Sequence, residues 1–314
     1  MSIQWSLWNI MITLDAFSLL QAPFMQRAIL IAIIIALLSA ILSIFIVLKR
    51  ISLIGDGLSH TAFGGYALGY YITAILFGSL ATYSYFAGII PQWVGAITVI
   101  LGSIGINKAL RSTKIAGDAA VAVFLQLGLA AGVTLVSITG GFGVNLENLL
   151  FGSILAVDFQ QILIAGIVTT VSLAIIFLFF KELVYITFDE TQARAAGIRT
   201  WVYDYLLSIL AGVTVVIAIP VVGVLLMSAL LVLPALISTQ VTKSFKQTVI
   251  LAPIIGLITV IFGIIISVII NAAPGGTIVL TGLAILAIVI IGKKIQNSSK
   301  PNQIKPNPAN LKKN

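Results

Sequence analysis

The sequence contains one histidine, which stands four residues after an aspartate in a stretch of otherwise apolar or small residues, Gly55-Asp56-Gly57-Leu58-Ser59-His60. If this stretch is helical, the Asp56 and His60 side chains lie on one face, about 5–6 Å apart at Cβ. Carboxylate and neutral imidazole are common ligands of zinc, and they also bind manganese and iron. The pair therefore predicts a site for a divalent metal ion.

A structural role is the alternative for this pair, in which Asp56 and His60 share a hydrogen bond that pins their helix to a neighbour. Two ligands are also fewer than the four that zinc usually has. A symmetric dimer would supply the pair twice, and the chain has no other His and no Cys. The metal hypothesis therefore includes a dimer.

The composition determines the class of protein in which this pair lies. Of the 314 residues, 60% are hydrophobic and only 8% are charged, whereas a soluble domain carries about 25% charged residues. A span needs about 20 apolar residues, so we predict an all-α polytopic membrane protein with eight or nine transmembrane helices. The net charge of +8 then belongs to short loops, and nucleic acid is not an expected partner.

Apolar stretches separated by charged loops predict nine spans. They cover about 24–48, 52–77, 89–107, 118–138, 154–180, two within 201–241 that turn near Pro220–Gly223, 248–270 and 277–292. One long helix with a re-entrant segment in 201–241 would reduce the number to eight. Residues 24–292 form the predicted permease domain. Residues 1–23, which include Trp5 and Trp8, are predicted to lie in the membrane interface, and residues 293–314 form a predicted disordered cytoplasmic tail.

The basic residues test this arrangement. With nine spans and the N-terminus outside, every Lys and Arg except Arg27 falls on one side of the membrane, which is the pattern of cytoplasmic loops. His60 follows Arg50 by ten residues, so at about 1.5 Å per residue it lies at most about 15 Å deep. A carboxylate at the depth of Asp56 becomes protonated or finds a cation.

The loop after the fifth span is predicted to hold a short helix. Residues 187–190, Thr-Phe-Asp-Glu, fit a capping box with Thr187 as N-cap and Glu190 at N3. Gly197 suits the end of such a helix, and Arg194 near this end suits the helix dipole. The helix is either an inert connector or a docking element for a soluble partner.

Four stretches resemble the permease subunits of bacterial ABC importers for zinc, manganese or iron (the ABC-3 family): residues 47–60, 149–155, 188–198 and 226–235. The resemblance extends over roughly residues 24–292. It implies a homo- or heterodimer of permeases in the plasma (inner) membrane, a cytoplasmic ATP-binding subunit and an extracellular or periplasmic metal-binding protein. It also implies that Asp56 and His60 take part in metal passage. The residues implied to belong to the helix that couples the permease to the ATPase are Phe188, Asp189, Glu190, Arg194 and Gly197.

The expected function is inward transport of a divalent metal by alternating access. The chain has no G-x-x-x-x-G-K-[ST] phosphate loop, so ATP hydrolysis is expected from another polypeptide, and this subunit is not expected to be an enzyme. No permanently bound cofactor is expected besides the transported metal, and the region around Gly152 favours zinc over manganese. The rival functions are an ATP-independent cation transporter or channel, an intramembrane enzyme that uses the pair as acid and base, and a membrane scaffold.

Overall fold

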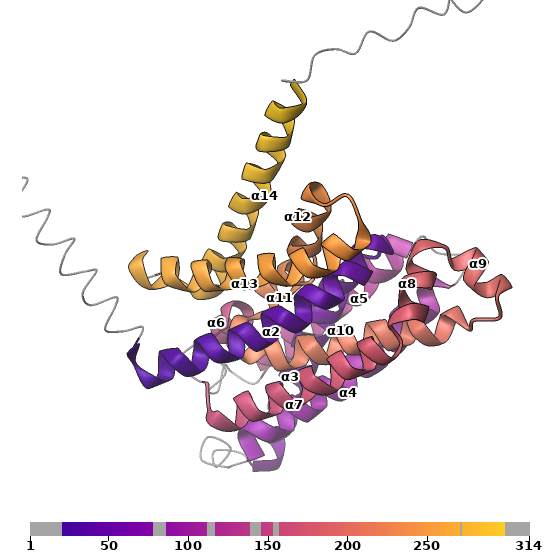
Figure 1. Cartoon of the computed structure of the whole chain (residues 1–314). Coiled ribbons are helices and arrows are strands. Elements are labelled where there is room, and N and C mark those ends of the chain that lie inside the picture. Colours follow the sequence, from indigo (N-terminus) through magenta and orange to yellow (C-terminus); the bar gives the residue numbers. More distant parts are fainter. Residues whose placement is uncertain are drawn as a thin grey trace, which may run out of the picture.

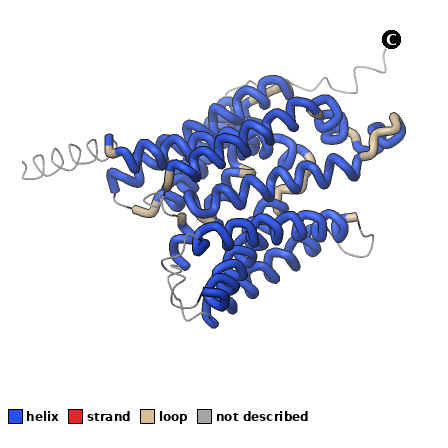
Figure 2. Tube along the Cα trace, turned by 90° about the horizontal axis from the view of Figure 1, so that it is seen from below, coloured by secondary structure: helices blue, strands red, loops and turns tan. Residues whose placement is uncertain are grey.

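The computed structural model describes residues 21–77, 86–111, 117–138, 146–152, 157–270 and 272–298. Within these ranges all regular secondary structure is helical (Figure 2), which confirms the all-α class. The helices are α2 (Pro23–Leu48), α3 (Ile54–Phe77), α4 (Phe86–Leu110), α5 (Gly117–Ile138), α6 (Leu146–Phe151), α7 (Phe159–Leu178), α8 (Phe180–Phe188), α9 (Glu190–Ala195), α10 (Thr200–Val222), α11 (Val224–Leu230), α12 (Leu233–Val241), α13 (Phe245–Ile270) and α14 (Pro274–Ser298).

Two predicted segments lie largely outside the described residues. The N-terminal interfacial segment is described only from residue 21, and the predicted tail only as far as Ser298. That last part of the tail is helical, because α14 continues past the predicted end of its span at 292. The predicted start of the fifth span, near Ile154, also lies outside the described residues, and α7 begins at Phe159.

Eight stretches of the described residues are long and apolar enough to cross a membrane, with α11 and α12 counted together as one. The α3 helix is not among them, because its Asp, His, Gly and Tyr residues lower its apolarity. Its 24 residues nevertheless span about 36 Å. Together with α3, the described part of the chain therefore holds nine helical segments long enough to span the bilayer.

Side-chain contacts bring the basic ends of these helices to one side. Lys49 at the end of α2 and Arg111 after α4 both form ion pairs with Asp204 near the beginning of α10. Near the end of α14, the Lys293 Nζ lies 3.4 Å from the Gln240 Oε1 of α12. The predicted cytoplasmic ends of α2, α4 and α10 therefore meet, and so do those of α12 and α14, as the charge pattern requires.

At the side of the bundle opposite to the basic ends, glycines allow the helix ends and loops to pack closely together. Gly152 after α6 and Gly223 after α10 have φ of 78° and 82°. Residues other than glycine rarely adopt this backbone conformation. A Cβ on Gly152 would lie 2.4 Å from the Val221 carbonyl oxygen, and one on Gly275 would lie 2.7 Å from that of Phe151. The α10 and α14 helices therefore each run between the basic side and the glycine side.

The α10 helix lies in the middle of the bundle. It contacts α2 on one side and α3 and α4 on another, while α13 packs against α2 and α5 packs against α3. In Figure 1, α2 and α13 lie side by side, and α14 leaves the stack at a steep angle. The most polar span, α3, is thus held among four helices, α4, α5, α10 and α11.

Candidate functional site

The predicted metal-ligand pair, Asp56 and His60, lies near the predicted cytoplasmic end of α3. This helix follows a short turn in which Arg50 has a positive φ of 59° and the Ile54 N–H donates to the Ile51 carbonyl at 2.9 Å. Asp56 lies in the first turn of α3, where a carboxylate is favoured by the helix dipole. The end of α2 and this turn therefore set the position of Asp56.

Small residues let neighbouring helices approach α3 closely. A Cβ on Gly128 of α5 would lie 2.3 Å from the His60 carbonyl oxygen, and a Cβ on Gly69 would lie 2.4 Å from the Cα of Pro91 in α4. On the α10 side, the Tyr66 hydroxyl donates to the Val216 carbonyl at 2.8 Å. Such close packing replaces the hydrophobic effect, which does not drive helices together inside a bilayer.

One face of α3 stays open at the level of the pair. Between Ile54 and Ala67, Asp56 and His60 are the only residues that are not buried. Their spacing of four places them on the same face, as predicted, and the Asp56 charge acts on the His60 ring. The structure therefore brings both predicted ligands to one accessible strip of the otherwise buried first part of α3, residues 54–67.

One nitrogen of the His60 ring lacks a hydrogen-bond partner among the described residues. Its Nδ1 is buried and unpaired, and a buried unpaired polar atom costs about 1–3 kcal/mol. The hydrogen bond required by the structural alternative, between Asp56 and His60, is therefore not made through Nδ1. No group of three or more His, Cys, Asp or Glu residues within the described ranges could hold a metal ion, so a single chain offers these two ligands.

The predicted cap of the short cytoplasmic helix is wrong. The N-cap of α9 is Asp189, whose side chain accepts from the Gln192 N–H at 2.9 Å. Thr187 instead belongs to α8, where its hydroxyl donates to the Leu183 carbonyl at 2.6 Å. The α8 helix continues through Thr187 because Leu183 and Ile186 on its inner face are buried, so α9 begins only at Glu190.

The other predicted features of α9 are present. Gly197 has a φ of 84°, and the Ile198 N–H donates to the Ala193 carbonyl at 3.0 Å, which is the pattern of a Schellman C-terminus. Arg194 Nη2 donates to Glu190 Oε1 at 2.5 Å. Partial burial alone would raise the pKa of Glu190, but the hydrogen bond from Arg194 and the charges of Lys49 and Arg194 hold this pKa below its ordinary value. The contact is therefore intact at neutral pH and is lost only in acid.

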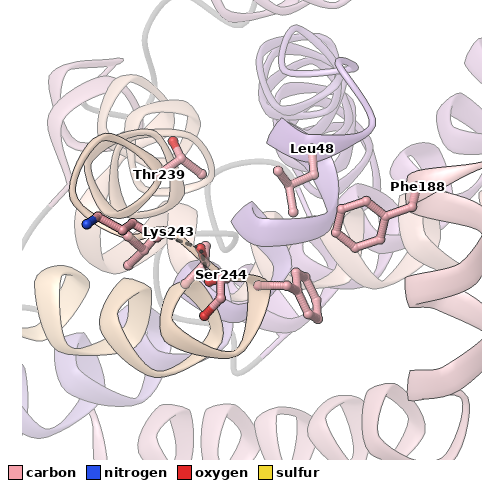
Figure 3. A pocket seen from close by; sticks show the side chains of 8 residues that line it. Leu48, Phe188, Thr239, Lys243 and Ser244 are labelled. Atoms are coloured by element: carbon pink, nitrogen blue, oxygen red, sulfur yellow. Dashed lines mark hydrogen bonds between the residues drawn. The ribbon is translucent and has the colours of Figure 1, made fainter. Parts of the chain in front are cut away.

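A cavity of about 350 Å³ separates the end of α2 from α8 and α9; it is lined by Leu48, Lys49, Arg50, Ile186, Thr187, Phe188 and Glu190. Figure 3 shows the Phe188 ring beside Leu48, and Phe188 is 62% exposed. Two of the predicted coupling residues, Phe188 and Glu190, therefore share this cavity with the residues that lead into α3. Asp204, which pairs with Lys49 here, was not identified from the sequence. A single acidic residue near the basic ends of several helices could have indicated that it forms ion pairs with them.

The bundle, its polar span α3 and its exposed short helix on the basic side are the features of a multi-pass membrane permease. Residues 21–293 match the model of the ABC 3 transport family. The chain therefore belongs to this family, as its motifs predicted, and it is a permease subunit of an ABC transporter in the plasma membrane.

Known relatives cover most of the chain. It is 30% identical over 270 residues to the manganese transport system membrane protein MntC of Halalkalibacterium halodurans, covering 86% of this chain and 87% of that protein. It is 33% identical over 265 residues to the manganese import system permease protein ScaB of Streptococcus gordonii, covering 84% of this chain and 90% of that protein. A probable iron transport system membrane protein of Haemophilus influenzae is 32% identical over 257 residues, covering 82% of this chain and 85% of that protein.

Two solved structures share the fold. PsaBC from Streptococcus pneumoniae, in complex with Fab, superposes with a TM-score of 0.74 at 29% identity and covers 88% of this chain and 95% of that chain. An inward-facing putative metal-chelate type ABC transporter superposes with a TM-score of 0.64 at 15% identity, with 91% and 96% covered. The second likeness concerns the fold alone.

Proposed function

We propose that this permease passes a divalent transition metal into the cytoplasm and that manganese is its main cargo, with iron as the second candidate. The names of the relatives above support manganese and iron. They give no support to zinc, which the region around Gly152 favoured. Carboxylate oxygen is a ligand that suits manganese, and imidazole suits iron.

The position of Asp56 and His60 together on the open strip of α3 is the observation that carries this proposal. A second permease subunit facing this strip would bring the ligands to two carboxylates and two imidazoles. Transport requires binding that is strong enough to admit the ion and weak enough to release it. Two ligands from each subunit meet this requirement better than a closed site within one chain.

Energy for transport comes, in this proposal, from a separate cytoplasmic ATPase that docks on α9, and an outer binding protein delivers the metal. The exposed Phe188 and the helix that follows it provide the docking element. The α8 helix, which leads into α9, packs against α2, and the end of α2 leads into the turn before α3. A shift of α9 therefore moves the end of α3 on which Asp56 lies.

Uptake of radioactive manganese tests the roles of the two side chains. We expect His60→Ala and Asp56→Asn each to reduce uptake at least tenfold, because each removes one ligand. Ser59→Ala is the matched control, since the Ser59 hydroxyl is buried next to His60 and has no hydrogen-bond partner among the described residues. Normal uptake by the His60→Ala variant, with normal amounts of protein in the membrane, would refute the proposed pathway.

A second measurement separates this function from an ATP-independent transporter or channel. The permease is purified from its native membrane, and the accompanying polypeptides are tested for ATP hydrolysis. We expect an ATP-hydrolysing subunit to co-purify and uptake in vesicles to stop when ATP is replaced by a non-hydrolysable analogue. Continued metal flux with that analogue would favour the channel.

A further inference from the structure

An apolar groove of about 620 Å³ runs between α8 and the beginning of α13. Its lining residues are Phe180, Lys181, Val184, Tyr185, Phe188, Phe245, Lys246, Val249 and Ile250. We propose that this groove is a binding site for one anionic phospholipid of the cytoplasmic leaflet, with the headgroup between Lys181 and Lys246 and an acyl chain on the apolar walls.

The charges of the groove favour an anionic ligand. Lys181 and Lys246 are both exposed, and neither Asp nor Glu lines the groove. The acid nearest in sequence, Glu182, has a buried carboxylate oxygen and acts on Tyr203 of α10 instead. Basic pockets between membrane helices on the cytoplasmic side are suited to acidic lipid headgroups, and Tyr185 also lines the groove.

The apolar walls continue from the groove into the bilayer. On the α7 side, Phe177 and Leu178 are 66% and 74% exposed, and on the α13 side Ile250 and Ile254 are 66% and 45% exposed. Both helices carry these side chains away from the basic end and towards the middle of the membrane. An acyl chain that leaves the groove therefore meets exposed apolar side chains on both helices.

The inner end of the groove is closed by aromatic packing. The rings of Phe188 and Phe245 meet edge to face with centroids 5.4 Å apart, and Phe180 packs against Phe245 at 6.1 Å. Behind them lies a separate pocket of about 150 Å³ between α12, α13 and Leu48 (Figure 3). The aromatic rings thus form a floor that keeps the apolar part of a ligand on the membrane side.

The groove also lies away from the metal strip. It borders α13, which packs on α2, whereas Asp56 and His60 lie on α3, which packs on α5, with α10 between the two groups. A second permease subunit that faces the strip on α3 leaves the groove in contact with lipid. The lipid site therefore does not depend on the transported metal, and its test needs no transport.

Native mass spectrometry of the purified full-length permease, with added phosphatidylglycerol or phosphatidylcholine, tests the proposal. We expect one retained phosphatidylglycerol per chain and much weaker retention of phosphatidylcholine. Each basic side chain near an acidic headgroup strengthens binding by about fivefold, so Lys181→Gln with Lys246→Gln should weaken phosphatidylglycerol binding about 25-fold. The control pair Lys108→Gln with Lys294→Gln removes the same charge from other exposed positions at the basic side and should leave the retained lipid in place.

A second variant, Val184→Trp, fills the apolar part of the groove without any change of charge and should also displace the lipid. Circular dichroism and thermal unfolding in lipid-free detergent show whether each variant is folded. Unchanged phosphatidylglycerol binding by either folded variant, or equal retention of phosphatidylcholine by the wild-type chain, would overturn the proposal. The variant with Lys181→Gln and Lys246→Gln could also retain all of its lipid but no longer bind the ATPase. That result would overturn the proposal and would assign the groove to ATPase binding.

Discussion

Asp204 shows how a single side chain can hold several helices together. Its carboxylate pairs with Lys49 and with Arg111, and the exposed fractions of these three side chains are 17%, 13% and 33%. Ion pairs that are this well covered are screened less than those on an open surface. Asp204 therefore anchors the end of α4 and the turn that precedes Asp56 and His60.

Asp204→Asn is expected to lower the free energy of unfolding by about 2 kcal/mol, because two partly buried cations lose their acidic partner. Denaturant titration of the purified permease in mild detergent measures this change. Asp118→Asn is the control, since Asp118 is exposed in the first turn of α5 and should cost less than about 1 kcal/mol. Equal losses for the two variants would show that the Asp204 pairs contribute no more than a surface charge.

At the scale of an element, α9 is a six-residue helix that depends on its ends. A helix this short is unstable alone, so its N-cap at Asp189, its C-terminal turn at Gly197 and its contacts with Thr200 maintain it. α8 and α9 lie together at one end of the bundle (Figure 1). Contacts within the chain thus hold this exposed helix in place.

Asp189→Ala should weaken the association of the permease with its ATPase, because loss of an N-cap costs about 1 kcal/mol, or about fivefold in affinity. Pull-down of the ATPase by the tagged permease measures the effect. Thr187→Val is the matched control, because Thr187 lies in α8 and caps nothing in α9. A stronger effect of the Thr187 variant than of the Asp189 variant would restore the capping box that the sequence pattern favoured.

At the scale of the whole molecule, the two sides of the bundle are distinct. Basic residues and Asp204 gather at one side, while glycine contacts join the loops at the other. Because α2 and α4 both end at Asp204, the chain must cross the membrane twice between them. The α3 helix is therefore a full span, although its composition alone does not identify it as one.

Single cysteines test this sidedness, since the natural chain has none. We expect Arg50→Cys and Lys108→Cys to be protected from a membrane-impermeant maleimide in intact cells and Ala272→Cys to be labelled. All three should react after the cells are opened. Labelling of Lys108→Cys but not Arg50→Cys in intact cells would mean that α3 does not cross.

The sequence by itself determined the spans, their direction and the spacing of Asp56 and His60, because apolar length, charge and helical period are local properties of a chain. Tertiary structure alone decided which side chains meet across distance. Asp204 reaches partners 155 and 93 residues away, and Gly152 lies against the turn at Gly223. Tertiary structure also decided the N-cap of α9, since Thr and Asp are both favourable N-cap residues and the sequence offers Thr187 and Asp189. The choice between them depended on how far packing extended α8, and the open face of α3 depended on where four other helices covered it.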